Sequence, residues 1–372
     1  MSARLDPRRL GMAAAAPLLA IVVAVLVTTV ILLVAGDPVG AVWSQLFKVP
    51  LPRQIIAIVN AATVYYLSAI AVAIGFRMNL FNIGVDGQYR VASFAAALFA
   101  GQGWLPGWLN VIVALLVAMA SGAVWAGIAG LLKITRGVSE VISTIMLNAI
   151  ATFLVAFLLG KTAERVQGSN ATNTKPLPDD SRVPGISLDG IIATPSRVYG
   201  LIVLAVVVGF AYWFVLNKTR FGFDLRATGR SESAAVASGV KVKRMVLTSM
   251  LISGAAAGLV GMPLLFGQDY VYGDTVQAGL GFAGIAIALL GRNHPVGIAF
   301  AALLWAYLDA QGNGLQITAG VSDRLVLVIQ GVIVLSVVIA YEVVRRAGIA
   351  MEQRRVAAEL ARRQPATEGA AA

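Results

Sequence analysis

Long apolar segments separated by short polar stretches dominate this chain. A helix needs about 20 mostly apolar residues to cross the ~30 Å hydrocarbon core of a bilayer, and most of the segments reach that length. The segment 278–291 is shorter, so we expect a half-helix there or a span lengthened by its neighbours. The pattern predicts an all-α integral membrane protein with about ten transmembrane helices, one or two of them broken or short. The ten segments are 12–35, 54–75, 80–100, 108–132, 138–159, 198–216, 246–267, 278–291, 295–311 and 322–342.

Composition supports a membrane protein and excludes several kinds of site. The chain is 58% hydrophobic and 13% charged, whereas soluble domains carry about 25% charged residues. It has no cysteine, which excludes disulfides and cysteine-based metal sites, and its single histidine, His294, is too little for a histidine-rich metal site. We therefore expect neither a metal nor a cofactor. The net charge of +11 is explained by basic cytoplasmic loops facing anionic lipid, without nucleic acid as a partner.

The distribution of lysine and arginine predicts the topology. The first apolar run, 12–34, is longer than the roughly 7–15 residues of a signal-peptide core, so we interpret it as a retained first span. With the N-terminus inside, 20 basic residues fall on the cytoplasmic side and 8 outside. This split follows the positive-inside rule and places both termini in the cytoplasm. We expect a transmembrane domain over 1–342 with an extracytoplasmic loop at 160–197, and a basic cytoplasmic tail at 343–372, for which a solvated end is favoured over a helix.

One long polar stretch, 217–245, interrupts the hydrophobic second half of the chain. It carries seven basic residues against two acids, Asp224 and Glu232, and should face the cytoplasm. A short helix-like core, Ser231 to Ser238, lies between Gly229 and Gly239. A small Ala-rich helix shown to the cytoplasm by a membrane protein is typical of contact with a soluble partner.

The sequence shows no nucleotide site or catalytic constellation of its own. Gly160-Lys161-Thr162 resembles the end of a phosphate-binding loop, but the required upstream glycine is replaced by Val155. No Ser/His/Asp arrangement or paired-carboxylate motif is present. The chain is therefore not expected to be an enzyme.

Polar residues concentrate at the start of the third apolar segment, where burial of charge is costly and usually functional. Two interpretations stand beside each other: a broken helix that lines a translocation path, or a tight turn at a helix interface with Asp86 and Arg90 paired at i,i+4. Asn148, in the middle of another segment, is either a hydrogen-bond partner between helices or a further path residue. The candidates for the substrate path are Asn82, Asp86, Gln88 and Asn148.

The second half repeats this theme more weakly. The Gly-rich segment 279–291 resembles the region around Gly84 and Gly87, which suggests an internal repeat. Small residues at 122, 126 and 130 and at 254 and 258 permit close helix packing. Residues 268–270 and Asp309, near the outer end of its span, line an outer entrance or, as we favour, are solvated loop residues.

Four motifs occur in the order found in a known family: FNIGVDGQ (Phe81–Gln88), SEVISTIMLN (Ser139–Asn148), TRFGFDLRATGRSESAAVASGV (Thr219–Val240) and GFAGIAIALLG (Gly281–Gly291). The chain resembles the permease subunits of bacterial ABC importers for nucleosides and simple sugars, which are related to ribose and branched-chain amino acid permeases. The resemblance covers residues 50–340. It departs from the family at Asp86, where Glu is frequent, and at Ser139, where Asn is frequent, and both changes bear on the substrate.

The resemblance implies function and partners. It implies a multi-pass protein of the bacterial inner membrane that takes energy from an ATP-binding subunit. It also implies a second permease subunit, a different chain in many nucleoside systems, and an extracytoplasmic substrate-binding lipoprotein. The loop after the sixth span would dock on the ATP-binding subunit. The residues implied at that contact are Gly229, Arg230, Ser231, Glu232, Ala234, Ala235 and Gly239.

Two alternatives remain open at this point. The same architecture could carry branched-chain amino acids or another small solute. A self-powered secondary transporter, coupled to an ion gradient through Asp86, belongs to a different class.

Overall fold

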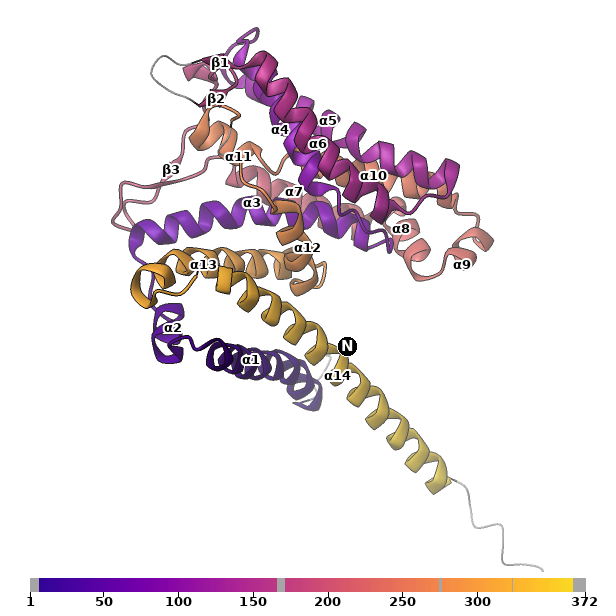
Figure 1. The fold of residues 1–372 in the computed structure, drawn as a ribbon. Coiled ribbons are helices and arrows are strands. Elements are labelled where there is room, and N and C mark those ends of the chain that lie inside the picture. The colour runs from indigo at the N-terminus through magenta and orange to yellow at the C-terminus, as the bar shows by residue number, and fades with distance from the viewer. Residues whose placement is uncertain (1–6, 166–170, 274–275, 323, 364–372) are drawn as a thin grey trace, which may run out of the picture. The chain divides into compact units, whose positions relative to one another are not determined.

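The computed structural model describes residues 7–165, 171–273, 276–322 and 324–363, and most of them are helical (Figure 1). The chain divides into two compact units. The larger unit comprises residues 48–311, and the smaller one joins residues 1–47 to residues 312–372.

The first half of the larger unit contains long helices that begin and end at recognisable signals. Pro52 occupies the first turn of its helix, where the missing N–H costs nothing. Gly137, with φ of 69°, ends another helix in the left-handed conformation that glycine adopts readily. The helices are α3 (Pro52–Phe76), α4 (Val85–Gly101), α5 (Gly107–Arg136), α6 (Glu140–Thr162) and α7 (Ile202–Lys218).

The second half of the larger unit is more broken. The segment predicted as one span over 246–267 is interrupted after α10, and it ends in the π-helical turn η2 before Tyr270, which has a positive φ of 56°. The elements are α8 (Arg220–Arg230), α9 (Glu232–Ala237), α10 (Val242–Gly258), α11 (Met262–Leu264), η2 (Leu265–Asp269), α12 (Leu280–Leu290) and α13 (Pro295–Ala319), whose residues from 312 onward are assigned to the smaller unit.

In the described parts of the predicted extracytoplasmic loop, 160–197, short paired strands form a cap. Strand β1 (Glu164–Arg165) pairs with β2 (Thr172–Asn173), and β3 (Ile186–Ser187) pairs with β4 (Arg197–Val198), with the short helix η1 (Asp179–Ser181) between the pairs. The cap is held to the segment after α11 by backbone hydrogen bonds. These are Thr174 N to Tyr272 O and Leu177 N to Tyr270 O, both 2.8 Å, and Val183 N to Phe266 O, 2.9 Å.

The smaller unit contains α1 (Pro7–Ala35), α2 (Val39–Leu46) and α14 (Arg324–Arg363), and α1 packs along α14. Trp43 on α2 donates its indole N–H to the Thr29 hydroxyl of α1 at 3.1 Å. Helix α14 continues through the basic tail as far as Arg363, so this part of the tail takes the helical alternative. The rest of the predicted tail, 364–372, lies outside the described residues.

A helix occupies each of the ten predicted segments. Six of the described helices are long and apolar enough to cross a membrane, and the number rises to seven if α7 and α8, which are bent by 74°, are taken as one span. Helix α4 has 17 residues and α12 only 11, so α12 is the short helix that the sequence predicts. The all-α membrane fold is confirmed, and the internal repeat stays a prediction.

Small residues bring α5 and α10 into close contact. A methyl group added at Gly122 would lie 3.0 Å from the backbone nitrogen of Gly258. The predicted stripe of small residues thus lets two helix backbones approach.

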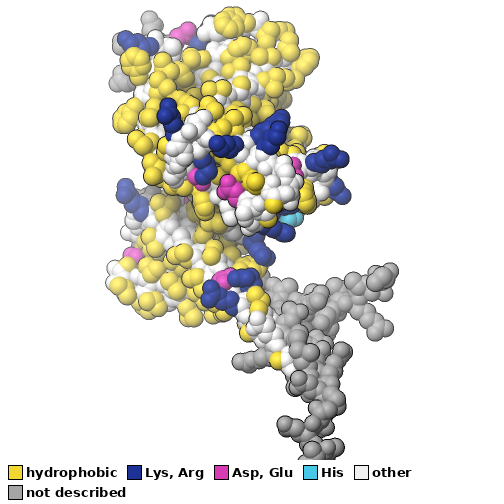
Figure 2. Space-filling view, turned by 90° about the vertical axis from the view of Figure 1, so that its right-hand side faces the viewer, with side chains coloured by type: hydrophobic (Ala, Val, Ile, Leu, Met, Phe, Trp, Pro, Cys, Tyr) yellow, Lys and Arg dark blue, Asp and Glu magenta, His cyan; other side chains and the backbone are white. Residues whose placement is uncertain are grey.

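The surface of the larger unit is largely apolar. Figure 2 looks onto the side where α8 and α9 lie, and basic side chains gather there beside hydrophobic ones. Large apolar side chains also project from α6 and α7, as Phe153 (76% exposed) and Phe210 (63%) do. A surface of this kind is suited to lipid or to neighbouring membrane helices.

Candidate functional site

The turn between α3 and α4 packs two amide side chains into the protein. Asn82 and Gln88 exchange hydrogen bonds of 2.9 and 2.8 Å through their side-chain amides. Asn82 also donates to the Ser253 hydroxyl on α10 at 2.7 Å and accepts from the backbone N–H of Gly84 at 3.1 Å. Both amides are fully buried. In this conformation they join α4 to α10, and contact with substrate stays a prediction.

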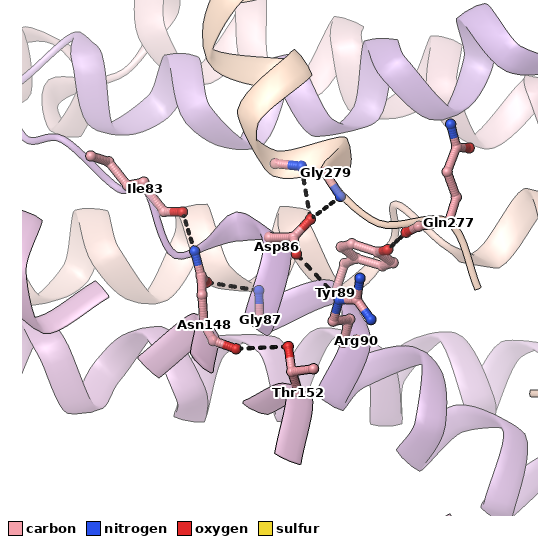
Figure 3. A network of polar contacts seen from close by, with 10 residues as sticks. Ile83, Asp86, Gly87, Tyr89, Arg90, Asn148, Thr152, Gln277 and Gly279 are labelled. Carbon is pink, nitrogen blue, oxygen red and sulfur yellow. Dashed lines mark hydrogen bonds and ion pairs between the residues drawn. The ribbon is translucent and has the colours of Figure 1, made fainter. Parts of the chain in front are cut away.

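Asp86 joins α4 to the beginning of α12 (Figure 3). Its Oδ1 accepts the backbone N–H groups of Gly279 at 2.9 Å and Gly281 at 3.4 Å, while Oδ2 accepts Nε of Arg90 at 3.2 Å. A helix N-terminus has unpaired N–H groups and a positive dipole end, so a carboxylate is stabilised there. The bond to Arg90 is the i,i+4 pair that the interfacial-turn interpretation predicted.

Asn148 fastens α6 to α4. Its Oδ1 accepts the backbone N–H of Gly87 at 2.8 Å, and its Nδ2 donates to the carbonyl of Ile83 at 2.9 Å (Figure 3). Gly87 permits this approach, because a Cβ at that position would lie 3.0 Å from Cβ of Ala151. The structure thus gathers the four predicted path residues around the start of α4, and it gives Asn148 the role of a hydrogen-bond partner between helices.

The predicted coupling segment, residues 229–240, is helical on both sides of Ser231. The Ser231 hydroxyl accepts the backbone N–H of Ala234 at 3.3 Å and caps α9. Glu232 and Ala234 are exposed, whereas Ala235 is buried and Gly229 packs against the turn at Met78. Arg230 and Gly239 are also exposed, and Ser231 is half-buried.

An exposed apolar residue of α9, Val236, was not among the predicted contact residues. The sequence alone did not single it out, because the buried position of Ala235 that turns Val236 outward is visible only in the structure. The outward face of α9 therefore comprises its exposed residues Glu232, Ser233, Ala234, Val236 and Ala237, and Ala235 is the residue that the helix buries.

A polar pocket of about 510 Å³ opens on the side of the larger unit that carries the 160–197 cap. The chain positions that form it are far apart: in α3, around β4, in α11 and η2, and at Gln277 before α12. Two arginines, Arg53 and Arg197, are exposed at the pocket. Among the described residues that line it, none is Asp or Glu. The polar lining residues are Arg53, Asn60, Ser196, Arg197, Tyr199, Gln268 and Gln277.

We name this pocket the outer pocket after the cap beside it, which is predicted to be extracytoplasmic. Its wall is held by side chains that also bond to one another. Asn60 donates to the carbonyl of Arg197 at 3.0 Å and accepts the backbone N–H of Tyr199 at 2.8 Å. The Tyr199 hydroxyl donates to Oε1 of Gln268 at 2.5 Å. The Tyr199 hydroxyl is the donor of this bond, because an amide oxygen such as Oε1 can only accept.

The residues of the pocket were mostly missed by sequence reasoning. Only Gln268 belonged to a segment considered for an outer entrance, and its place on a π-helical turn fits the frequent use of such turns at functional sites. In the described parts of the chain, no group of three or more His, Asp or Glu side chains could hold a metal ion.

Comparison with known proteins gives a consistent set of relatives. The family described as "Branched-chain amino acid transport system / permease component" matches residues 54–338. The guanosine ABC transporter permease protein NupP of Bacillus subtilis is 34% identical over 336 residues, covering 88% of this chain and 93% of the relative.

Two further relatives cover similar lengths. The nucleoside ABC transporter permease protein NupB of Lactococcus lactis is 29% identical over 334 residues, with 87% of this chain and 90% of the relative covered. The glucose ABC transporter permease protein TsgB13 of Haloferax volcanii is 31% identical over 364 residues, with 94% and 95% covered.

Proposed function

The chain belongs to the family of permease components of branched-chain amino acid transport systems, as a multi-pass membrane subunit of the ABC transporter class, and we propose that it carries nucleosides, or alternatively simple sugars, into a bacterial cell. Energy would come from ATP hydrolysed by a partner subunit. Guanosine, nucleoside and glucose permeases among its relatives support this substrate range.

The outer pocket is the observation that supports nucleosides or simple sugars as the substrate class. Its volume of about 510 Å³ lies in the range of small-molecule sites, roughly 300–1,000 Å³. Its lining combines the apolar side chains of Ile56, Val64 and Leu264 with amide side chains and the Tyr199 ring. A nucleoside or sugar likewise has an apolar face and several uncharged hydrogen-bonding groups.

Branched-chain amino acids fit this pocket less well. Their ammonium group needs a carboxylate or several acceptors once it leaves water, because an unpaired charge is costly to desolvate. The described lining has two arginines and no carboxylate. The arginines would attract the amino acid's carboxylate but repel its ammonium group.

Coupling to an ion gradient through Asp86 is not favoured by the geometry. The carboxylate already accepts the N–H groups of Gly279 and Gly281 and pairs with Arg90. A carboxylate satisfied in this way holds helices together, and the family is one of ABC permeases.

Docking of the ATP-binding subunit is assigned to the outward face of α9. This helix exposes Glu232, Ala234 and Val236, while Ala235 anchors it to the protein. Small side chains let such a helix enter a groove of a partner, and the exposed Val236 adds apolar contact. A second permease subunit and an extracytoplasmic binding lipoprotein would complete the importer.

Uptake by the assembled importer tests the substrate assignment. Proteoliposomes should accumulate labelled guanosine or uridine in preference to leucine, with glucose and ribose as the sugar arm. Gln268→Leu should raise the KM for the nucleoside roughly tenfold, since one or two hydrogen bonds between the Gln268 amide and the substrate would be lost. Gln102→Leu, which changes an exposed glutamine outside this pocket, is the control. Preferential leucine uptake would contradict the assignment.

Copurification tests the docking face. Val236→Asp places a charge on the exposed apolar position of α9 and should release the ATP-binding subunit while the permease stays in the membrane. Ile191→Asp makes the same kind of change at an exposed position of the 160–197 cap and should leave the complex intact. Retention of the ATP-binding subunit by Val236→Asp would assign docking to another surface.

A further inference from the structure

The Asn79 side chain joins the coupling segment to the turn between α3 and α4, residues 77–84. Asn79 donates its Nδ2 hydrogen to the carbonyl of Gly229 at 2.9 Å. Gly229 allows the two backbones to meet, because a Cβ there would lie 2.9 Å from Cα of Met78. Asn79 itself has a φ of 56°, a conformation that asparagine tolerates better than most residues.

The same turn holds several membrane helices. The backbone N–H of Phe81 donates to Glu140 at the start of α6 at 3.4 Å, and Glu140 pairs with Lys133 of α5 at 2.5 Å. At the other end of the turn, Asn82 bonds Ser253 of α10, and Ile83 accepts from Asn148 of α6. Consecutive residues therefore reach different helices.

A further contact joins the turn to the end of α12. Arg77 donates to the carbonyl of Asn293, which also accepts the Tyr212 hydroxyl of α7 at 2.9 Å. Helix α4 follows the turn directly, and its Asp86 holds the beginning of α12. A displacement of the turn would consequently act on both ends of α12.

The coupling segment and the turn also line one pocket of about 270 Å³, which the turn reaches with Asn79 and Leu80 and the coupling segment with Arg230 and Glu232. The Asn79–Gly229 hydrogen bond joins these two parts of the chain. We propose that Asn79 is a positioning residue that transmits movement of the coupling segment to the start of α4 and, through Asp86, to α12.

This inference rests on the proposed docking of the ATP-binding subunit at α9. It adds that docking and transmission are separate properties of the chain. The docking face is the outside of α9, whereas Asn79 is on the turn, so a change at Asn79 should spare the partner contact and lower the number of substrate molecules moved per ATP.

Three substitutions at Asn79 distinguish the effect of its side-chain hydrogen bond from the effect of its positive φ. Asn79→Gly keeps the positive φ and removes the donor. Asn79→Asp keeps the size and replaces the donor by an acceptor facing the Gly229 carbonyl. Asn79→His tolerates positive φ and keeps an N–H donor. The matched control is Asn217→Ala, which removes an exposed Asn N–H bond of 2.9 Å to the carbonyl of Trp213 at the end of α7.

The measurement is nucleoside uptake per ATP hydrolysed by the complete importer in proteoliposomes. Asn79→Gly and Asn79→Asp should retain the ATP-binding subunit and lower uptake per ATP about fivefold, the lower end of the 5–150-fold range typical of coupling between sites. Asn79→His and Asn217→Ala should stay near the unsubstituted protein. If Asn79 served only to form the turn, Asn79→Gly would leave uptake per ATP unchanged, because glycine adopts the positive φ without strain.

Two outcomes would overturn the proposal. Uptake per ATP unchanged in Asn79→Gly would show that the bond transmits nothing, and loss of the ATP-binding subunit in that variant would show that Asn79 acts on docking itself. The Val236→Asp copurification assay reports separately on docking. A failure of the docking assignment is therefore distinguishable from a failure at Asn79.

Discussion

Asp86 shows how a single residue can hold a charge inside a membrane protein. The carboxylate is buried, yet its two oxygens accept three donors, from Gly279, Gly281 and Arg90. A buried charge is tolerated when it is paired and hydrogen-bonded, and removing one partner leaves the others uncompensated. Asp86 should therefore matter first for the stability of the α4–α12 contact.

Asp86→Ala is expected to lower the free energy of unfolding in detergent by about 3–5 kcal/mol, the range for breaking a buried ion pair. Asp179→Ala is the matched control, because it removes an exposed i,i+3 pair with Arg182 at 2.8 Å, worth about 0–1 kcal/mol. Thermal unfolding of the two purified variants measures the difference. Equal midpoints would contradict a stabilising role for Asp86. Uptake should also fall in Asp86→Ala.

Gly87 makes a second prediction at the residue scale. A Cβ at this position would lie 2.9 Å from Oδ1 of Asn148, so Gly87→Ala must push α6 away from α4. We expect a cost of about 1–3 kcal/mol, as for other overpacked contacts. Gly160→Ala, in α6 with no atom within 4 Å, should instead be neutral or slightly stabilising. Denaturant unfolding decides between them, and a harmless Gly87→Ala would mean that the helices can separate freely.

At the scale of elements, hydrophobic length predicted most of the fold. All ten apolar segments contain helices because a long apolar run must satisfy its backbone internally when no water is available. The elements that were missed do not depend on this rule. Helix α2 has only eight residues, and α8 is an Arg-containing helix whose buried face is built from Gly222, Leu225 and Thr228.

The site was only partly visible in the sequence. Asn82, Asp86, Gln88 and Asn148 were recognised as costly polar residues within apolar segments, but their partners were not. Asp86 meets Gly279 across 193 positions of the chain, and no local pattern encodes that contact. The outer pocket was missed for the same reason, since its walls come from four separate parts of the chain.

The N-cap residue of α9, Ser231, gives a prediction at this scale. Ser231 accepts the Ala234 N–H, and replacing such a cap by alanine costs about 1 kcal/mol. Ser231→Ala should therefore speed amide hydrogen exchange over 234–239, whereas Ser231→Asp, which retains a capping oxygen, should not. Mass-spectrometric exchange of the permease without its ATP-binding subunit measures this directly. Equal exchange in both variants would show that the helix is held by Ala235 packing alone.

At the scale of the whole molecule, the two proposed surfaces need opposite sides of the membrane. The outer pocket must receive substrate outside the cell, and α9 must meet an ATP-binding subunit inside it. The two sites belong to chain segments that the positive-inside count assigns to different sides: α9 lies in the basic stretch 217–245, and β4 ends the 160–197 cap. The orientation of the chain is therefore a condition for the whole proposal.

Single cysteines can test this orientation without background, because the chain has none of its own. Ile191→Cys, at a position 82% exposed in the cap, should react with a membrane-impermeant maleimide added to intact cells. Ser233→Cys, exposed on α9, should react only after the cytoplasmic face is opened, for example in inside-out vesicles. The unsubstituted chain controls for labelling of other groups. Labelling of both positions from the same side would remove the physical basis for placing substrate entry and ATPase docking on opposite faces, because one impermeant reagent would then reach both sites.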